Sequence, residues 1–230
     1  MTSFSKVLVF AAHPDDEVIG CGGLIRKLVK AGAQVSVVVV TGGQTGVSPA
    51  FQHIGDIAQA RQQESEAAQS ILGFQKLMFL PYKTQEVKND QETFHSFIKL
   101  IRLEKPDLVL THAEHDKHRD HQTVSVITKE AVWKAWENVM PNLGQRHRVT
   151  ETWYYEVTDP FQRVDILVDI SNEMDAKLEA IQAHYTQQEV IPGIEGLIEG
   201  LGKTRAFLLE TQYAEGYQVC SILPRVVDTQ

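Results

Sequence analysis

The chain has 230 residues and a formal net charge of −8 at pH 7. This length suits one sizeable hydrophobic core, so we predict a single domain over residues 1–230. The negative charge leaves no excess of cations to neutralise phosphates, which argues against nucleic acid as a partner.

The N-terminal sequence and the two cysteines bear on the cellular compartment. The stretch MTSFSKVLVFAAH carries one lysine and a short apolar run, which fits neither a signal peptide nor a membrane span. Cys21 and Cys220 lack the spacing of a disulfide framework or a thiolate zinc site, and we expect two buried thiols. We therefore expect a cytoplasmic protein without a membrane span.

The first half of the chain alternates strands and helices. Short apolar segments predict strands buried on both faces at residues 6–12, 33–41, 76–82 and 107–113. Helical spacing lies between them at residues 18–31, 57–72 and 91–104. This alternation predicts right-handed crossovers and a mostly parallel central sheet, that is, an α/β Rossmann-like three-layer sandwich.

The second half departs from this alternation. Its pattern predicts a helix, two β-rich segments and two more helices at residues 120–137, 150–158, 164–170, 172–188 and 194–210. We expect these elements to include a C-terminal β/α extension of the fold. The loop at 138–149 contains Pro141, Asn142 and Gly144, so we expect it to be the most mobile segment.

A dense acidic motif follows the first predicted strand. The sequence AHPDDE occupies residues 12–17, so His13, Asp15 and Asp16 leave the sheet at its carboxyl end, where open α/β folds bind ligands. Adjacent carboxylates repel one another, and buried unpaired charge is costly, so we expect a divalent cation here. Glu17 has a simpler interpretation, because an acid in the first turn of a helix interacts favourably with the helix dipole.

A second cluster of metal-binding residue types follows the fourth predicted strand. Residues 111–122, THAEHDKHRDHQ, hold four histidines and three acids. His118 and His121 are three positions apart, and on a helix they share one face. In the doubly wound strand order 3-2-1-4-5 the first and fourth strands are neighbours, so the two clusters would flank one crevice. A lone histidine or Asp-Asp pair is usually structural, but two clusters that meet at one crevice favour a metal site.

The two motifs resemble the PIG-L/LmbE-like family of zinc-dependent N-acetylglucosaminyl deacetylases. Its signature is AHPDDE after the first strand and HPDH after the fourth. Here AHPDDE is intact, and HRDH at 118–121 has Arg119 in place of proline. Weaker similarities are ARQQESEAAQSILG at 60–73, which looks like the RxxE helix of the family, and KLEAIQAHYTQ at 177–187, which looks like its K...H.SQ helix. The resemblance covers most of the chain.

The resemblance implies a role for each polar residue of the two motifs. Asp15 would be the general base. His118 would stabilise the oxyanion or protonate the leaving amine, and Asp120 would orient His118 and favour its cationic form. The cofactor would be Zn²⁺ or another divalent transition metal, and its implied ligands are His13, Asp16 and His121.

Three residues outside the motifs are implied as substrate contacts, namely Arg61, His184 and Gln187. For Arg61 the competing interpretation is a surface salt bridge to Glu64 or Glu66. For His184 the alternative is a surface position on the polar side of its predicted helix.

The other residues of the second cluster are not expected to bind the metal. His112 lies at a strand end and His115 in a loop, so we expect neither to bind the metal. Asp116 is a candidate partner for one of the metal ligands.

The implied function is hydrolysis of a linear amide C–N bond. The substrate would be an N-acetylglucosamine-type sugar or sugar conjugate, and the products acetate and a free amine, with metal-bound water as the nucleophile. The family also implies a homo-oligomer. An amidase or ester deacetylase for a non-sugar substrate stays open, as does a non-catalytic metal-binding homologue, although Asp15 and His118 are not needed in a purely structural site.

Two glycine-rich segments raise a different possibility, a dinucleotide-binding oxidoreductase. They are GCGG at 20–23 and TGGQTG at 41–46. The dinucleotide fingerprint needs its glycines directly after the first strand and an acid at the end of the second, but HPDD and Thr41 occupy these positions. No GK[ST] follows TGGQTG, which argues against a P-loop. We expect this segment to line the substrate site.

Overall fold

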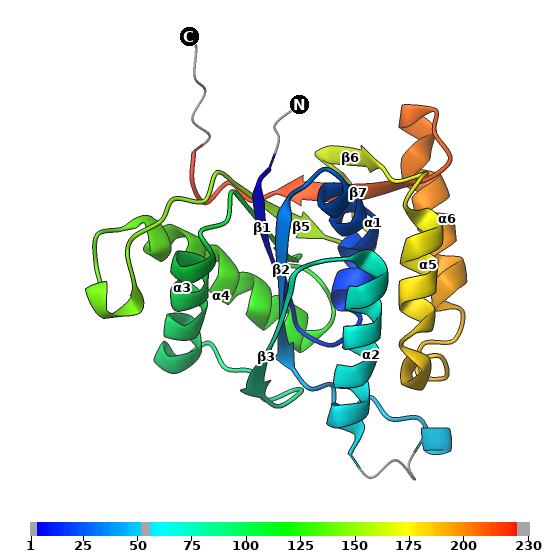
Figure 1. The fold of residues 1–230 in the computed structure, drawn as a ribbon, viewed down its shortest axis with the longest axis horizontal. Helices are drawn as coiled ribbons and strands as arrows, with labels where there is room; N and C mark the ends of the chain where they lie inside the picture. The colour runs from blue at the N-terminus through cyan, green and yellow to red at the C-terminus, as the bar shows by residue number, and fades with distance from the viewer. Residues whose placement is uncertain (1–3, 52–55, 225–230) are drawn as a thin grey trace.

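A computed structural model describes residues 4–51 and 56–224 of the chain. A central sheet separates two layers of helices (Figure 1). The strands of this sheet are β1 (Lys6–Ala11), β2 (Gln34–Thr41), β3 (Lys76–Tyr82), β4 (Leu108–His112), β5 (Glu151–Tyr155), β6 (Ile166–Asp169) and β7 (Ala214–Val219). The helices are α1 (Asp16–Lys30), α2 (Ile57–Leu72), α3 (Gln91–Glu104), α4 (Arg119–Trp136), α5 (Met174–Gln182) and α6 (Ile194–Ala206).

The sheet is mostly parallel, as the alternation of strands and helices predicts. Within the described residues its strands follow the order β3-β2-β1-β4-β5-β7-β6. Strands β1 to β5 pair in parallel, whereas β7 is antiparallel to both β5 and β6. The predicted fold class is therefore confirmed, with β1 and β4 adjacent as the 3-2-1-4-5 order requires.

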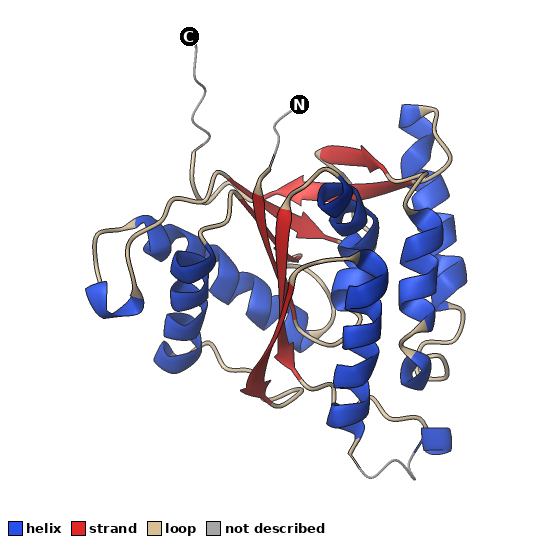
Figure 2. Ribbon diagram, in the orientation of Figure 1, coloured by secondary structure: helices blue, strands red, loops and turns tan. Residues whose placement is uncertain are grey.

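Both faces of the sheet are buried under helices. Helices α3 and α4 cover one face, and α1, α2, α5 and α6 lie over the other (Figure 2). Alternate residues of β1 serve the two cores: Val7 and Val9 pack on the side of α1, and Leu8 and Phe10 on the side of α3 and α4. This double burial explains why the strand sequences are continuously apolar.

The C-terminal part differs from its prediction at three places. Helix α5 ends at Gln182, so the predicted helix 172–188 is too long, and a 3-10 turn at Tyr185–Gln187 follows. The predicted helix 194–210 corresponds to α6 and a 3-10 turn at Phe207–Leu209. Strand β7, AEGYQV, was not predicted, because its polar residues and glycine hide the apolar alternation of a strand.

The loop expected to be mobile is tied to α3. The guanidinium of Arg102, which is 2% exposed, donates hydrogen bonds to the backbone carbonyls of Met140 and Gly144 in this loop. It also donates to three carbonyls around the end of α4, at Lys134, Ala135 and Glu137. A single buried cation therefore anchors the loop, and a composition rich in turn residues does not reveal such an anchor.

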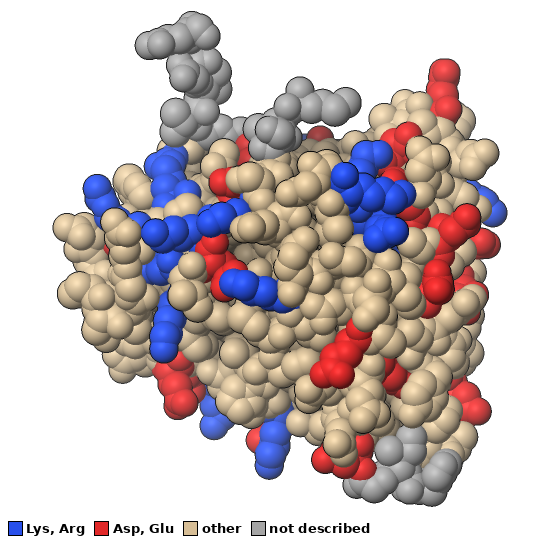
Figure 3. All heavy atoms as spheres, in the orientation of Figure 1, with Lys and Arg blue, Asp and Glu red and all other residues tan. Residues whose placement is uncertain are grey.

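The surface carries both signs of charge. On the face that Figure 3 shows, Lys and Arg side chains form separate groups among neutral residues, and Asp and Glu side chains lie both beside these groups and toward the right and lower edges. Within the described ranges, no helix is long and apolar enough to cross a membrane. Cys21 and Cys220 are free and buried, as expected.

The glycines of GCGG allow α1 to pack closely against the sheet. A Cβ atom on Gly20 would lie 2.2 Å from Cδ2 of Tyr155 in β5, and one on Gly23 would lie 2.7 Å from Cδ1 of Ile170. These glycines therefore lie inside a helix and serve packing, which removes the structural basis for a dinucleotide fingerprint.

Gly20→Ala is expected to lower the free energy of unfolding by about 1–3 kcal/mol, because the added methyl group overlaps the ring of Tyr155. Gly200→Ala in α6 is the matched control, since a Cβ there meets no heavy atom within 4 Å. It should raise stability by about 0.5–1 kcal/mol through helix propensity. Urea denaturation measures both, and equal effects of the two substitutions would contradict the packing role.

Candidate metal centre

The first half of the site is the turn between β1 and α1. Asp15 adopts φ 116° and ψ −28°, a backbone conformation that residues other than glycine rarely adopt. Its carbonyl accepts the first hydrogen bonds of α1, from the N–H groups of Val18 and Ile19. The turn sends the two adjacent carboxylates in different directions, Asp15 toward Arg61 and Asp16 toward a group of histidines.

The second half of the site is the connection from β4 to α4. His118 is the N-cap of α4, and its Nδ1 accepts the backbone N–H of Asp120 at 3.2 Å. In the neutral ring this bond leaves the proton on Nε2. His121 lies one turn into α4 and is buried.

The two halves meet because β1 and β4 are paired, with Val9 opposite Leu110. Nδ1 of His13 lies 3.2 Å from Nε2 of His121 and 3.2 Å from Oδ2 of Asp16. Nε2 of His121 is 3.3 Å from Oδ1 of Asp16. Ligand atoms at about 2.0–2.1 Å from a tetrahedral zinc ion are about 3.3 Å from one another. The donor types and the spacing of the two imidazole nitrogens therefore fit a divalent cation of the zinc type, with the carboxylate of Asp16 beside both nitrogens.

Each of the two histidines uses its other ring nitrogen to contact a carboxylate. Nε2 of His13 lies 3.1 Å from Oδ2 of Asp120, and Nδ1 of His121 lies 3.2 Å from Oδ2 of Asp116. Asp116 also accepts hydrogen bonds from the backbone N–H of His118 and the hydroxyl of Thr158. Carboxylates in this position fix the orientation and tautomer of metal-binding histidines.

Asp120 thus contacts a different histidine from the one expected. The structure places its carboxylate against His13, whereas its backbone N–H donates to Nδ1 of His118. Oδ2 of Asp120 also accepts the backbone N–H of Gln85 at 2.7 Å. Gln85 was missed in the sequence, and its φ of 68°, unusual for a residue with a side chain, becomes visible only in the structure.

Two wider groupings of possible metal ligands surround this centre. In one, the donor atoms of His13, His118 and His121 lie within 4.8 Å of one another. In the other, His112 joins Asp16 and His121 at the same spacing. In the second grouping the distances to Asp16 are about as short as in the first set, 3.4 Å from Nε2 of His112 and 3.3 Å from Nε2 of His121.

His112 is occupied by other contacts, so the expectation that it does not bind the metal is supported by geometry. Its Nε2 accepts the backbone N–H of Ala12 at 2.9 Å and lies 3.2 Å from the hydroxyl of Tyr155. Burial lowers the pKa of His112 to about 4, with the neighbouring His121 adding to the effect. His112 is therefore neutral and its lone pair is engaged. His115 is exposed, beside Phe161.

The charges of the centre favour a cation. Burial acts against the charged form of His121, but Asp16 and Asp116 outweigh it and raise the pKa of His121 to about 10. The pKa of Asp16 is well below its ordinary value, because its histidine neighbours outweigh its burial. A site that retains a proton this strongly between two carboxylates is one in which a metal ion can replace that proton.

The other two acids of the motif, Asp15 and Glu17, differ from Asp16 because burial raises their pKa values. It raises the pKa of Asp15 to about 7, against the opposing charge of Arg61. It raises the pKa of Glu17 to about 8, so Glu17 is largely uncharged at neutral pH. Glu17 lies in the first turn of α1, as expected, but its burial disfavours the charged carboxylate that would interact with the helix dipole. Its Oε1 has no hydrogen-bond partner among the described residues.

Arg61 joins the HPDD turn to the TGGQTG loop. Its guanidinium is buried and donates to the carbonyls of Gly43 and Pro14 and to Oδ2 of Asp15, the last at 3.0 Å. A Cβ at Gly43 would lie 2.1 Å from Nη1 of Arg61, so only glycine leaves room here. The alternative of a surface salt bridge is wrong, because Arg61 pairs with Asp15 and Glu64 accepts hydrogen bonds from Thr186.

His184 and Gln187 lie beside Asp15. His184 follows the end of α5, is fully buried, and neither of its ring nitrogens has a hydrogen-bond partner in the described part of the chain. The alternative of a surface histidine is therefore wrong. Gln187 donates to the carbonyl of Gly46. Together with Asp15 and Ile19, both residues line a small cavity that has no room for a water molecule.

Comparisons with known proteins agree with this architecture. The sequence matches the PIG-L family, described as GlcNAc-PI de-N-acetylase, over residues 8–132. Diacetylchitobiose deacetylase of Thermococcus kodakarensis is 30% identical over 193 residues, covering 79% of this chain and 70% of that protein. A probable N-acetyl-alpha-D-glucosaminyl L-malate deacetylase 2 of Bacillus cereus is 29% identical over 191 residues, covering 80% of this chain and 84% of that protein.

A solved structure with a different activity also aligns with the chain. GalB, the 4-carboxy-2-hydroxymuconate hydratase of Pseudomonas putida, superposes with a TM-score of 0.83 at 25% identity. The alignment covers 98% of this chain and 99% of GalB.

Proposed function

Because the chain belongs to the PIG-L family of GlcNAc-PI de-N-acetylases, we propose that it is a metal-dependent N-deacetylase. Its substrate would be a small N-acetylglucosamine-type sugar or conjugate, and its products acetate and a free amine. The observation that carries this proposal is the meeting of three side chains from two distant segments. Nδ1 of His13 lies 3.2 Å from Nε2 of His121, and the two carboxylate oxygens of Asp16 lie 3.2 Å and 3.3 Å from these nitrogens.

Three residues of this chain would hold the cation, which we propose to be zinc: His13, Asp16 and His121. Two imidazoles and one carboxylate form a donor set typical of catalytic zinc, in which a fourth position remains open. A bound zinc ion lowers the pKa of water to about 7 and polarises a carbonyl group. The carboxylates of Asp120 and Asp116 hold the two imidazoles in place.

The remaining polar residues would move protons. Asp15 is next to a ligand but turned toward Arg61, which suits it to accept the proton of the attacking water. His118 has its Nδ1 occupied by the N–H of Asp120, so Nε2–H is free to donate to the developing oxyanion or the leaving amine. Asp120 would act on His13 rather than on His118.

The proposed substrate contacts lie beyond Asp15. His184 and Gln187 line the cavity beside it, and the buried Arg61 would act chiefly by holding Asp15 and the TGGQTG loop. The names of the two relatives given above, a diacetylchitobiose deacetylase and a probable N-acetyl-alpha-D-glucosaminyl L-malate deacetylase 2, support this substrate class. We also propose a single catalytic domain that self-associates, which analytical ultracentrifugation would test.

Removing the metal is expected to abolish acetate release, because the metal supplies the activated water. The assay is acetate release from a panel of N-acetylglucosaminides, before and after treatment with a chelator. Zinc added back should restore the activity, and metal analysis should find about one ion per chain. If the protein binds no metal and zinc restores no acetate release, the proposal fails.

His118→Ala is expected to lower kcat about 10²–10³-fold and to leave one zinc ion bound, since His118 acts as a proton donor in this proposal. Metal analysis and kinetics on the same preparation separate the two effects. Loss of the metal would place His118 among the ligands, as the wider grouping with His13 and His121 allows.

The similarity to GalB supports a second candidate, a hydratase. The observation in its favour is that the alignment spans nearly the full length of both chains. Loss of ultraviolet absorbance from 4-carboxy-2-hydroxymuconate would detect hydration of the conjugated double bond. Hydration without acetate release from any N-acetylglucosaminide would replace the deacetylase proposal by this one.

A further inference from the structure

Helix α1 is broken one turn after the candidate ligand Asp16. At Cys21 the backbone adopts φ −146° and ψ 19°, which is not helical, so α1 consists of two halves. Just after the break, the N–H groups of Gly23 and Leu24 donate to a side chain from another part of the fold. Their acceptors are Oε1 and Oε2 of Glu215 in β7, at 2.8 Å each.

Glu215 therefore caps the second half of α1 in the way that an N-cap residue serves a helix. Its charge is balanced inside the protein, because Nζ of Lys177 lies 2.6 Å from Oε1, and the hydroxyl of Tyr217 donates to Oε2. Glu215 is 5% and Lys177 4% exposed. A buried carboxylate with four hydrogen bonds and a cationic partner is stable, whereas one without its partner is costly.

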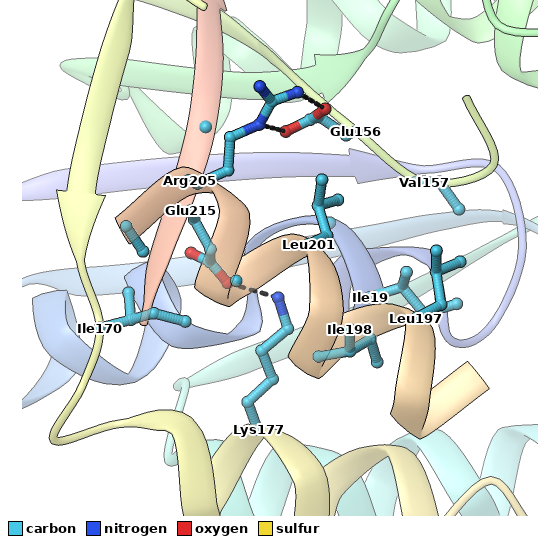
Figure 4. A pocket seen from close by; sticks show the side chains of 14 residues that line it. Ile19, Glu156, Val157, Ile170, Lys177, Leu197, Ile198, Leu201, Arg205 and Glu215 are labelled. Atoms are coloured by element: carbon cyan, nitrogen blue, oxygen red, sulfur yellow. Dashed lines mark hydrogen bonds and ion pairs between the residues drawn. The ribbon is translucent and has the colours of Figure 1, made fainter. Parts of the chain in front are cut away.

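The pair lines a small internal cavity, shown in Figure 4. The cavity has about 30 Å³ of space, enough for about one water molecule. A second ion pair, between the partly buried Arg205 and the buried Glu156, lines the same cavity. Glu156 accepts hydrogen bonds from Arg205 and from the N–H of Phe161, and none from α1. The two pairs are thus similar in charge and in the burial of the carboxylate but differ in their contact with α1.

We propose that Glu215, neutralised by Lys177, is a positioning residue for the metal centre: it fixes the break in α1 and thereby the first turn that carries Asp15 and Asp16. The inference rests on the proposed function, because that function is what places Asp15 and Asp16 of the first turn in a metal centre. The half-helix from Asp16 to Gly20 is a short segment that begins at the Asp15 turn and ends at the break, so its direction depends on the angle at Cys21. A change of angle at Cys21 therefore moves the carboxylates.

Glu215→Gln is the test variant, because it keeps the shape of the side chain but replaces one of the two acceptor oxygens by an amide that cannot accept. One of the N–H groups of Gly23 and Leu24 then loses its partner. Glu156→Gln is the matched control. It makes the corresponding change in the ion pair on the other side of the same cavity. Lys177→Met is a second variant, which leaves the carboxylate of Glu215 without its cation.

The measurements are the zinc affinity, with zinc alone as the probe, the steady-state kinetics and the hydrogen exchange of the peptide covering 16–25. For Glu215→Gln and Lys177→Met we expect zinc affinity to fall about 10–100-fold. We expect kcat to fall with KM nearly unchanged, and exchange at 16–25 to become faster. Glu156→Gln should lower the melting temperature but keep the zinc affinity and exchange at 16–25 of the wild type.

Two outcomes would overturn the inference. In the first, Glu215→Gln and Glu156→Gln lose similar stability and both bind zinc as the wild type does, so Glu215 is only structural. In the second, both lose zinc affinity equally, so the effect is one of general destabilisation. If the wild-type protein itself binds no zinc, the proposed function fails together with this inference. This outcome is distinguishable from the other two, in which the wild type binds zinc.

Discussion

Asp15→Asn is expected to reduce the rate of acetate release about 10³-fold while one zinc ion stays bound. A general base contributes about 10²–10⁴-fold to such a rate, and an amide cannot take up the proton of the attacking water. Asp15 lies beside the ligand Asp16 but contacts Arg61, so its replacement leaves the contacts among His13, Asp16 and His121 intact.

The substitution also suits the local backbone. Asparagine has nearly the same size as aspartate and tolerates positive φ better than most residues, which matters at a φ of 116°. The side-chain oxygen of asparagine can still accept the hydrogen bond from Arg61. The measurement combines kcat/KM, metal content and thermal unfolding on one preparation. An active Asp15→Asn enzyme would remove Asp15 from the mechanism, and loss of zinc would make it part of the metal site.

His121→Ala is expected to lower zinc affinity more than about 100-fold and to abolish activity. His121 is the residue that links the two segments: its Nε2 faces His13 and Asp16, and its Nδ1 faces Asp116. Residues that merely orient a ligand cost about 10–100-fold in affinity, so a ligand should cost more. Two buried carboxylates also lose a cationic partner, and the variant should be less stable than the wild type.

Thermal unfolding with and without zinc separates these effects. Zinc at about 100 times its Kd should stabilise the wild type by about 2.7 kcal/mol, and it should leave the His121→Ala protein unchanged. His121→Gln, which fills more of the space, keeps the test valid if the alanine variant does not fold. His115→Ala is the matched control, since His115 belongs to the same cluster but is exposed, and it should bind zinc normally. Normal zinc binding by both His121 variants would contradict the ligand assignment.

The parts of the fold that depend on local pattern were predictable. The first four strands and the helices between them follow from continuous apolar runs and helical spacing, because both faces of the sheet are buried. The end of α5 did not follow, since no glycine or proline marks it. There the chain turns because Thr186 binds Glu64 of α2, at 2.8 Å and 2.9 Å, and this contact joins positions 122 residues apart.

In the candidate site too, some features were predictable from the sequence and others were not. Topology predicts that HPDD and HRDH meet, and Nδ1 of His13 lies 3.2 Å from Nε2 of His121. Which carboxylate serves which histidine depends on side-chain directions that spacing does not contain. Asp120 therefore faces His13 instead of His118, and the contribution of Gln85 was missed. The roles of these residues in catalysis stay predictions.

Glu215 illustrates the limit of sequence analysis most clearly. It lies in a strand that was not predicted, and it acts on the backbone of a helix 191 residues away in the sequence. For its partner Lys177, the sequence indicates only that it begins the helix motif KLEAIQAHYTQ. Neither residue belongs to a recognisable metal motif. Yet Glu215 binds the backbone of the helix that carries Asp16, and Lys177 binds Glu215.

The most direct test of the shared metal centre is an anomalous difference map at the zinc absorption edge, from crystals grown with one equivalent of zinc. We predict one strong peak about 2.0–2.2 Å from Nδ1 of His13, Nε2 of His121 and the carboxylate of Asp16. A map without a peak among these three residues, or with zinc bound elsewhere on the chain, would contradict the account.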